Sequence, residues 1–133
     1  MLVYLDDIEK ARWWKEAGLE VMSCRINAMR QQVEANGHTR FVLMVPPDKL
    51  TAYADFLQDR SLKDISLLPA LSALQPQVMP RIDLALDEAI RQGVQDVYLP
   101  DNTHWGSNGQ RIAAGALKLC GDCRPAGQDH ISR

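Results

Sequence analysis

The sequence predicts an α/β layered fold with three layers, in which helices cover both faces of a mostly parallel sheet. Two observations lead to this prediction. Apolar residues recur at helical spacing in several segments, and between them stand two short apolar runs, 41–45 and 97–99, each followed by a proline. Helices that alternate with buried strands are typical of a parallel sheet. Because only one weaker strand candidate, 77–82, accompanies these two, we expect the sheet to be incomplete.

The first third of the chain should form two helices and one strand. Asp6 and Asp7 can cap a helix that starts just after them, and Gly18 should interrupt it. A second helix is predicted to end at Asn36-Gly37, because four apolar residues before that point share one helical face: Met22, Ile26, Met29 and Val33. The run 41–45 is continuously apolar, which predicts a strand buried on both faces.

The rest of the chain is predicted to hold short helices around one further strand. A short amphipathic helix is indicated by Leu50, Tyr53, Ala54 and Leu57, and further helical turns are expected across 62–74. Residues 82–90 should form a helix that stops at Gly93, and Ser107 or Asn108 can cap the last helix. We expect one domain over residues 1–119 and an irregular tail over 120–133.

Composition excludes several classes of function. The chain has 133 residues, with 15 Lys and Arg against 17 Asp and Glu, so it lacks the excess cation that a nucleic-acid partner requires. Three cysteines are too few for a disulfide scaffold. No apolar run reaches 18 residues, and the first residues lack the pattern of a signal peptide. We therefore expect no membrane span and no nucleic-acid binding.

Reactive side chains gather in the two loops that follow the predicted strands, 46–49 and 101–105. Ligands of open α/β sheets bind beyond the carboxyl ends of the strands, where these loops lie. In the second loop, Asp101 can accept a hydrogen bond from one ring nitrogen of His104, so that the other nitrogen can take a proton from a hydroxyl nucleophile. No second ligand stands at metal-binding spacing from His104, and neither a metal nor a cofactor is expected.

The order of these features resembles the SGNH hydrolases, and most fully their permuted relatives that O-acetylate alginate and other bacterial polysaccharides. The shared features span about residues 4–117. They are an apolar strand (Phe41 to Val45), a Pro-x-Lys loop (Pro47-Asp48-Lys49) with a following Tyr53, and an aromatic strand that leads into Asp101-Asn102-Thr103-His104-Trp105 with Gly109 beyond it. The resemblance implies a three-layer SGNH or flavodoxin-like fold and a catalytic His104.

Two positions depart from the family pattern. In the permuted relatives the aspartate stands two residues before the histidine, where this chain has Asn102; Asp101, three residues before, is the predicted acidic partner. The family's nucleophilic serine follows a Gly-Asp pair well downstream, whereas the only Gly-Asp here, Gly121-Asp122, precedes Cys123. We therefore expect a partial domain that stops before the nucleophile and is inactive alone.

The resemblance implies an acyl-ester hydrolase or polysaccharide O-acetyltransferase, with an acyl ester or a polysaccharide as substrate, that works in the bacterial cell envelope or periplasm. His104 and Asp101 are the predicted catalytic pair, and four residues are predicted to contact substrate: Trp105, Lys49, Tyr53 and Asn102. A homodimer, or association through an incomplete sheet edge, is the expected assembly. The alternative is a non-catalytic module that binds a saccharide or a protein.

Overall fold

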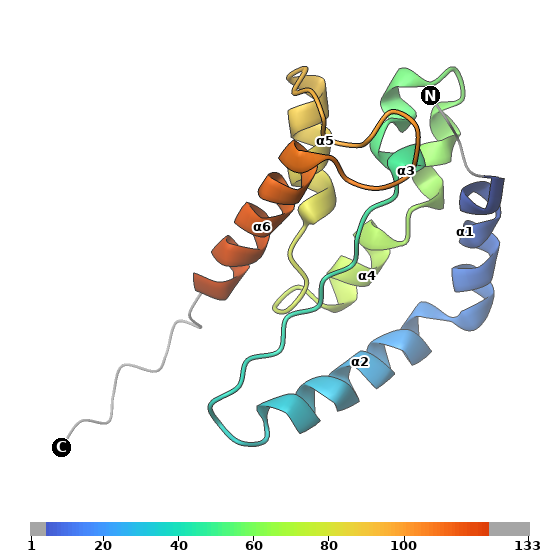
Figure 1. The fold of residues 1–133 in the computed structure, drawn as a ribbon. Coiled ribbons are helices and arrows are strands. Elements are labelled where there is room, and N and C mark those ends of the chain that lie inside the picture. The colour runs from blue at the N-terminus through green and yellow to red at the C-terminus, as the bar shows by residue number, and fades with distance from the viewer. Residues whose placement is uncertain (1–4, 123–133) are drawn as a thin grey trace.

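The computed structural model describes residues 5–122, and helices make up its regular structure (Figure 1). In chain order these are α1 (Leu5–Ala17), α2 (Leu19–Glu34), α3 (Lys49–Ala52), the 3₁₀ helices η1 (Ala54–Phe56) and η2 (Arg60–Ile65), α4 (Leu68–Leu74), α5 (Ile82–Arg91) and α6 (Ser107–Asp122). The predicted interruption at Gly18 and the helix stops near Gly37 and Gly93 are confirmed, and all three glycines have positive φ. Helix α6 continues three residues past residue 119.

The predicted three-layer fold with a parallel sheet is wrong. Between residues 5 and 122 there is no sheet, and the one bridge of β type is an isolated antiparallel contact between Tyr98 and Trp105. The segment 97–99 therefore pairs with the chain that returns just after it. A parallel partner would have to come from a distant segment instead.

The apolar run 41–45 is extended, but it lacks the neighbours that would make it a strand. One hydrogen bond joins its backbone to another segment, from the Leu43 amide to the Val78 carbonyl at 2.8 Å. Phe41, Leu43 and Val45 pack on a helical core, whereas Val42 and Met44 are 37% and 46% exposed. One face is thus partly buried and the other is open, although the continuous apolar pattern had predicted burial on both.

One hydrophobic core lies between α3, α5, α6 and the segment 97–98. Figure 1 shows α5 and α6 side by side, and their apolar faces meet there. The core residues are Ala52, Ile82, Leu86, Ala89, Ile90, Val97, Tyr98 and Ala113. Burial of each large apolar side chain contributes roughly 1.5–3 kcal/mol, so this core fixes the segments on both sides of the 99–104 loop.

A second core joins α2, α4 and the extended segment. Its buried members are Ile26, Leu68, Leu71 and Met79. A polar contact reinforces it, because the buried Gln75 amide donates to the Ser23 hydroxyl at 2.8 Å and to the Asn27 side chain at 3.1 Å. Helix α1 adds two further contacts: the Trp14 indole donates to the Ile65 carbonyl at 3.0 Å, and Lys10 pairs with Asp48 at 2.7 Å.

Helix α6 begins on a turn formed by Asp96. This residue has φ of 57°, a left-handed conformation that aspartate tolerates better than most residues. Its carboxylate accepts from the Ser107 amide at 2.8 Å, and its carbonyl accepts from the amides of Asn108 and Gly109. Amides that a helix start leaves without partners are thus satisfied by a residue eleven positions earlier.

Two glycines permit this close approach. An added Cβ on Gly106 would lie 2.2 Å from the Asp96 carboxylate, and one on Gly109 would lie 2.0 Å from the Val97 carbonyl oxygen. Gly115, on the same helix, has open space around it. The first turn of α6 therefore rests directly on the backbone of residues 96–97.

A small network of charges links η1, η2 and α5. Lys63 pairs with Asp55 at 2.5 Å and lies 3.6 Å from Asp87. The hydrogen bond from Lys63 lowers the pKa of Asp55, which is well exposed. Burial, in contrast, raises the pKa of Asp87 despite the nearby Lys63. The Lys63 ammonium thus forms ion pairs with two carboxylates, of which Asp55 is partly exposed and Asp87 is buried.

G109A is expected to destabilise the protein by roughly 1–3 kcal/mol, because the new methyl group must displace the Val97 backbone. The matched control G115A should be neutral or raise the free energy of unfolding by about 0.5–1 kcal/mol, since alanine costs less entropy than glycine in a helix. Urea denaturation measures both. Equal stability of the two variants would contradict the close contact.

D87N is expected to raise the free energy of unfolding at pH 7, because burial disfavours the charged carboxylate and so raises the pKa of Asp87. The gain should shrink as the pH falls through that raised pKa, and should vanish below the ordinary aspartate value of about 3.9. The control D55N should lower stability at pH 7 and converge with the parent in acid, since Lys63 lowers the pKa of Asp55. A D87N protein less stable than the parent at pH 7 would show that the Lys63 pair outweighs burial.

Candidate active site

The loop that carries His104 is closed at its base by backbone contacts. Tyr98 and Trp105 form the isolated bridge, the Leu99 amide donates to the His104 carbonyl at 2.9 Å, and the Gly106 amide donates to the Val97 carbonyl at 3.0 Å. Residues 100–103 lie between these closing contacts. Asp101 and His104 are exposed, so both can meet a ligand from solvent.

Asn102 makes the direct contacts with His104. Its side-chain oxygen accepts from the His104 backbone amide at 2.9 Å and lies 3.3 Å from the ring Nδ1. With Nδ1 protonated, the ring donates to this oxygen and Nε2 remains available as a base. A neutral amide can hold the ring in this way, but it adds no charge to stabilise the imidazolium.

Asp101 lies next to this pair. Its carboxylate accepts from the Asn102 amide at 3.4 Å, so it contacts the residue that orients the ring. Its part as the acidic partner of His104 stays a prediction. The structure brings Asp101, Asn102 and His104 together in that order along the loop.

Trp105 and the two tyrosines form the packed base of the loop. The Tyr98 hydroxyl donates to the Pro47 carbonyl at 2.9 Å and accepts from the Trp105 indole. The Tyr53 ring meets Tyr98 edge-on, with ring centroids 5.8 Å apart. Burial raises the pKa of both tyrosines, so both hydroxyls remain protonated at neutral pH. Trp105 is half-buried against the first core, and this contact gives it a packing role.

Lys49 lies beneath the loop. Its side chain comes from the start of α3, and the Asp48 carboxylate caps that helix by accepting from the Thr51 amide at 2.9 Å. The ammonium group donates to the carbonyls of Leu99, Pro100 and Asn102. The two loops that follow the apolar runs are therefore in direct contact.

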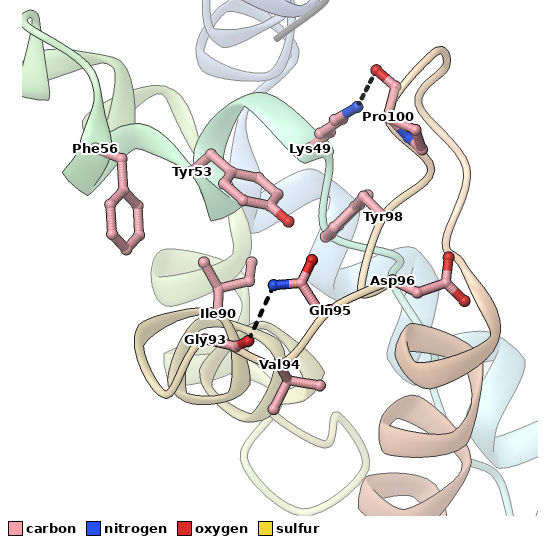
Figure 2. A pocket seen from close by; sticks show the side chains of 10 residues that line it. All are labelled: Lys49, Tyr53, Phe56, Ile90, Gly93, Val94, Gln95, Asp96, Tyr98 and Pro100. Carbon is pink, nitrogen blue, oxygen red and sulfur yellow. Dashed lines mark hydrogen bonds between the residues drawn. The ribbon is translucent and has the colours of Figure 1, made fainter.

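An open cavity of about 770 Å³ adjoins the loop (Figure 2). Its lining residues come from α3, η1, the end of α5 and the segment 93–100: Lys49, Tyr53, Phe56, Ile90, Gly93, Val94, Gln95, Asp96, Tyr98 and Pro100. Two of the predicted substrate-binding residues, Lys49 and Tyr53, therefore face this cavity. His104 and Trp105 are not among the residues that line it.

No serine in residues 5–122 has a recorded hydrogen bond to the His104 ring. Ser23 is buried against Gln75, and the Ser107 amide is held by Asp96. Cys123 lies outside the described residues. The described residues also contain no cluster of three potential metal ligands and no helix long and apolar enough to cross a membrane.

Asp96 is the site-supporting residue that the sequence analysis missed. In the sequence, Asp96 lies between the predicted helix that stops at Gly93 and the predicted strand 97–99, so it was expected to be part of the loop that joins them. The local signal was available, because aspartate is enriched at left-handed positions and caps helix starts. What the sequence could not show is that the helix it caps begins eleven residues later.

Comparison with known proteins identifies a matching family. The family model described as SGNH hydrolase-like domain, acetyltransferase AlgX, matches residues 4–120. No curated protein and no solved structure matches the chain. The match agrees with the resemblance drawn from the 41–53 and 97–109 segments. Since it covers most of the chain, the protein belongs to the SGNH hydrolase-like family of the acetyltransferase AlgX type.

Proposed function

We propose that this chain supplies the basic half of an acyl-transfer site that acts on O-acyl esters of a polysaccharide. The observation that carries the proposal is the arrangement of His104: Nδ1 faces the Asn102 oxygen, which leaves Nε2 free on an exposed loop. Family membership supports the reaction class, and an envelope location is consistent with that family.

The chemistry assigned to His104 is general base catalysis. Nε2 takes the proton of a hydroxyl nucleophile as its oxygen attacks the acyl carbonyl carbon. Collapse of the tetrahedral intermediate breaks the bond to the leaving alcohol, and the imidazolium returns its proton to that alcohol. A sugar hydroxyl or water then attacks this ester while His104 takes its proton, and the proton returns to the nucleophile's oxygen as the bond from that oxygen to the acyl group breaks.

The neighbours of His104 divide the supporting roles. Asn102 holds the ring, and the Asp101 carboxylate supplies negative charge beside it while the imidazolium exists. Trp105 and Tyr53 remain proposed substrate contacts. Tyr53 lines the adjoining cavity, and Trp105 directly follows His104 in the chain. Because no serine among residues 5–122 forms a hydrogen bond with the His104 ring, we propose that the chain alone has little esterase activity.

Hydrolysis of p-nitrophenyl acetate tests the proposed lack of a nucleophile. The chain and its H104A variant are expected to differ by less than about threefold in rate, because a base without its hydroxyl partner contributes little; a general base in a complete site is worth roughly 100-fold or more. A high rate that H104A abolishes would contradict this expectation and would show that the chain carries a nucleophile.

Saccharide binding separates the acyl-transfer proposal from the binding-module alternative. The observation that favours the alternative is the exposure of two aromatic side chains, Trp13 (71%) and Phe56 (61%). Tryptophan fluorescence would follow titration with O-acetylated and de-acetylated oligosaccharides. H104A should weaken binding of the acetylated ligand several-fold and leave the de-acetylated ligand unaffected, because the proposal places the acyl group against His104. Binding of both ligands that is insensitive to H104A would favour the module.

N102D tests whether Asn102 faces the ring. A carboxylate at this position is expected to stabilise the imidazolium, so the His104 ring should titrate at a higher pH than in the parent chain. NMR of the ring carbons measures this. Asn36 offers a matched control, since its oxygen accepts from the His38 amide at 2.9 Å as Asn102 does from His104. N36D should leave the His104 titration unchanged, and an equal effect of both variants would contradict the contact.

A further inference from the structure

Lys49 is a buried cation whose recorded polar contacts are all with carbonyl groups. Its residue is 4% exposed, and it has no ion pair among those recorded for residues 5–122. A buried ammonium is costly unless it is paired or fully hydrogen-bonded. Its three N–H groups donate to the carbonyls of Leu99, Pro100 and Asn102 at 2.5, 3.2 and 3.0 Å. All donors of the ammonium are therefore used.

The same contacts decide the shape of the loop. Three carbonyl oxygens that converge on one point repel each other through their partial negative charges, and the attraction of each oxygen to a cation between them outweighs this repulsion. They come from both sides of Asp101, so they define the turn in which Asp101 and Asn102 lie. In Figure 2 the Lys49 side chain points toward this turn.

Asn102 links Lys49 to His104. Lys49 holds the backbone carbonyl of Asn102, and the side chain of the same residue holds the His104 amide and faces its ring Nδ1. We propose that Lys49 is a positioning residue, which orients the His104 imidazole by fixing the Asn102 backbone. The catalytic meaning of this role rests on the proposed function of His104, whereas the positioning itself does not.

The helix that carries Lys49 is itself well anchored. Asp48 caps α3 and pairs with Lys10 of α1, and Leu50 is fully buried. The stem of Lys49 therefore starts from a fixed point, and its ammonium can act as a rigid support. Because its N–H groups are taken, Lys49 would contribute to a ligand mainly through its charge.

The first test uses the unmodified chain. The ¹⁵N-labelled ammonium of Lys49 should exchange its protons with water at least tenfold more slowly than those of Lys10 and Lys63, which are partly exposed. It should also show couplings across hydrogen bonds to the carbonyl carbons of residues 99, 100 and 102. Exchange as fast as that of Lys10 would overturn the proposal.

The second test compares K49M with K63M. Methionine keeps most of the apolar stem, and Lys63 is a matched control because its ammonium also links separate elements but lies away from the loop. In K49M the amides of Leu99 and His104 should exchange at least tenfold faster, and the His104 ring ¹⁵N shifts should move toward the tautomer mixture of free histidine. K63M should change neither.

Unchanged ring shifts in K49M would overturn the positioning role, because a purely stabilising lysine would leave the tautomer as it is. If K49M does not fold, the ammonium exchange in the unmodified chain decides the question. None of these measurements uses acyl-transfer activity, so an inactive His104 and an unpositioned His104 give different results.

Discussion

The placement of α6 on the backbone of residues 96–97 is the constraint on which the rest of the site depends. Asp96 accepts three amides from the first turn of the helix, and Gly106 and Gly109 leave no side chain in the way. Once this contact forms, the chain between Val97 and Gly106 must return upon itself. The Tyr98–Trp105 bridge and the exposed loop above it follow from that closure.

An exposed histidine is usually mobile, because too few contacts offset the conformational entropy lost when it is ordered. Here the order comes from two sides. The hydrophobic core holds Tyr98 and Trp105 at the base of the loop, and the Lys49 ammonium holds its carbonyls from beneath. Solvent thus reaches His104 while the backbone under it is fixed. The exposed position of His104 gives access to solvent, and the residues that hold the loop backbone in place are others: Tyr98, Trp105 and Lys49.

Local features of this chain were predictable, whereas distant pairings were not. The helix breaks at Gly18 and Gly93 follow from positive φ, and the Asn102–His104 contact is a short turn that asparagine forms readily. The sheet was wrongly predicted because an apolar run such as 41–45 indicates contact with a hydrophobic core and cannot show which segment lies beside it. The partners of Lys49 and Asp96 are likewise long-range, about 50 and eleven residues away.

Membership in an SGNH hydrolase-like family and the absence of a sheet within residues 5–122 are compatible at the level of the site. A sheet would align the loops at residues 46–49 and 100–105 by placing the segments before them side by side. Here no bridge joins the two segments, and the loops meet through Lys49 instead. The Lys49 ammonium and the start of α6 fix the His104 loop, so the geometry of this loop depends on contacts between loops, and His104 can keep its place without a sheet beneath it.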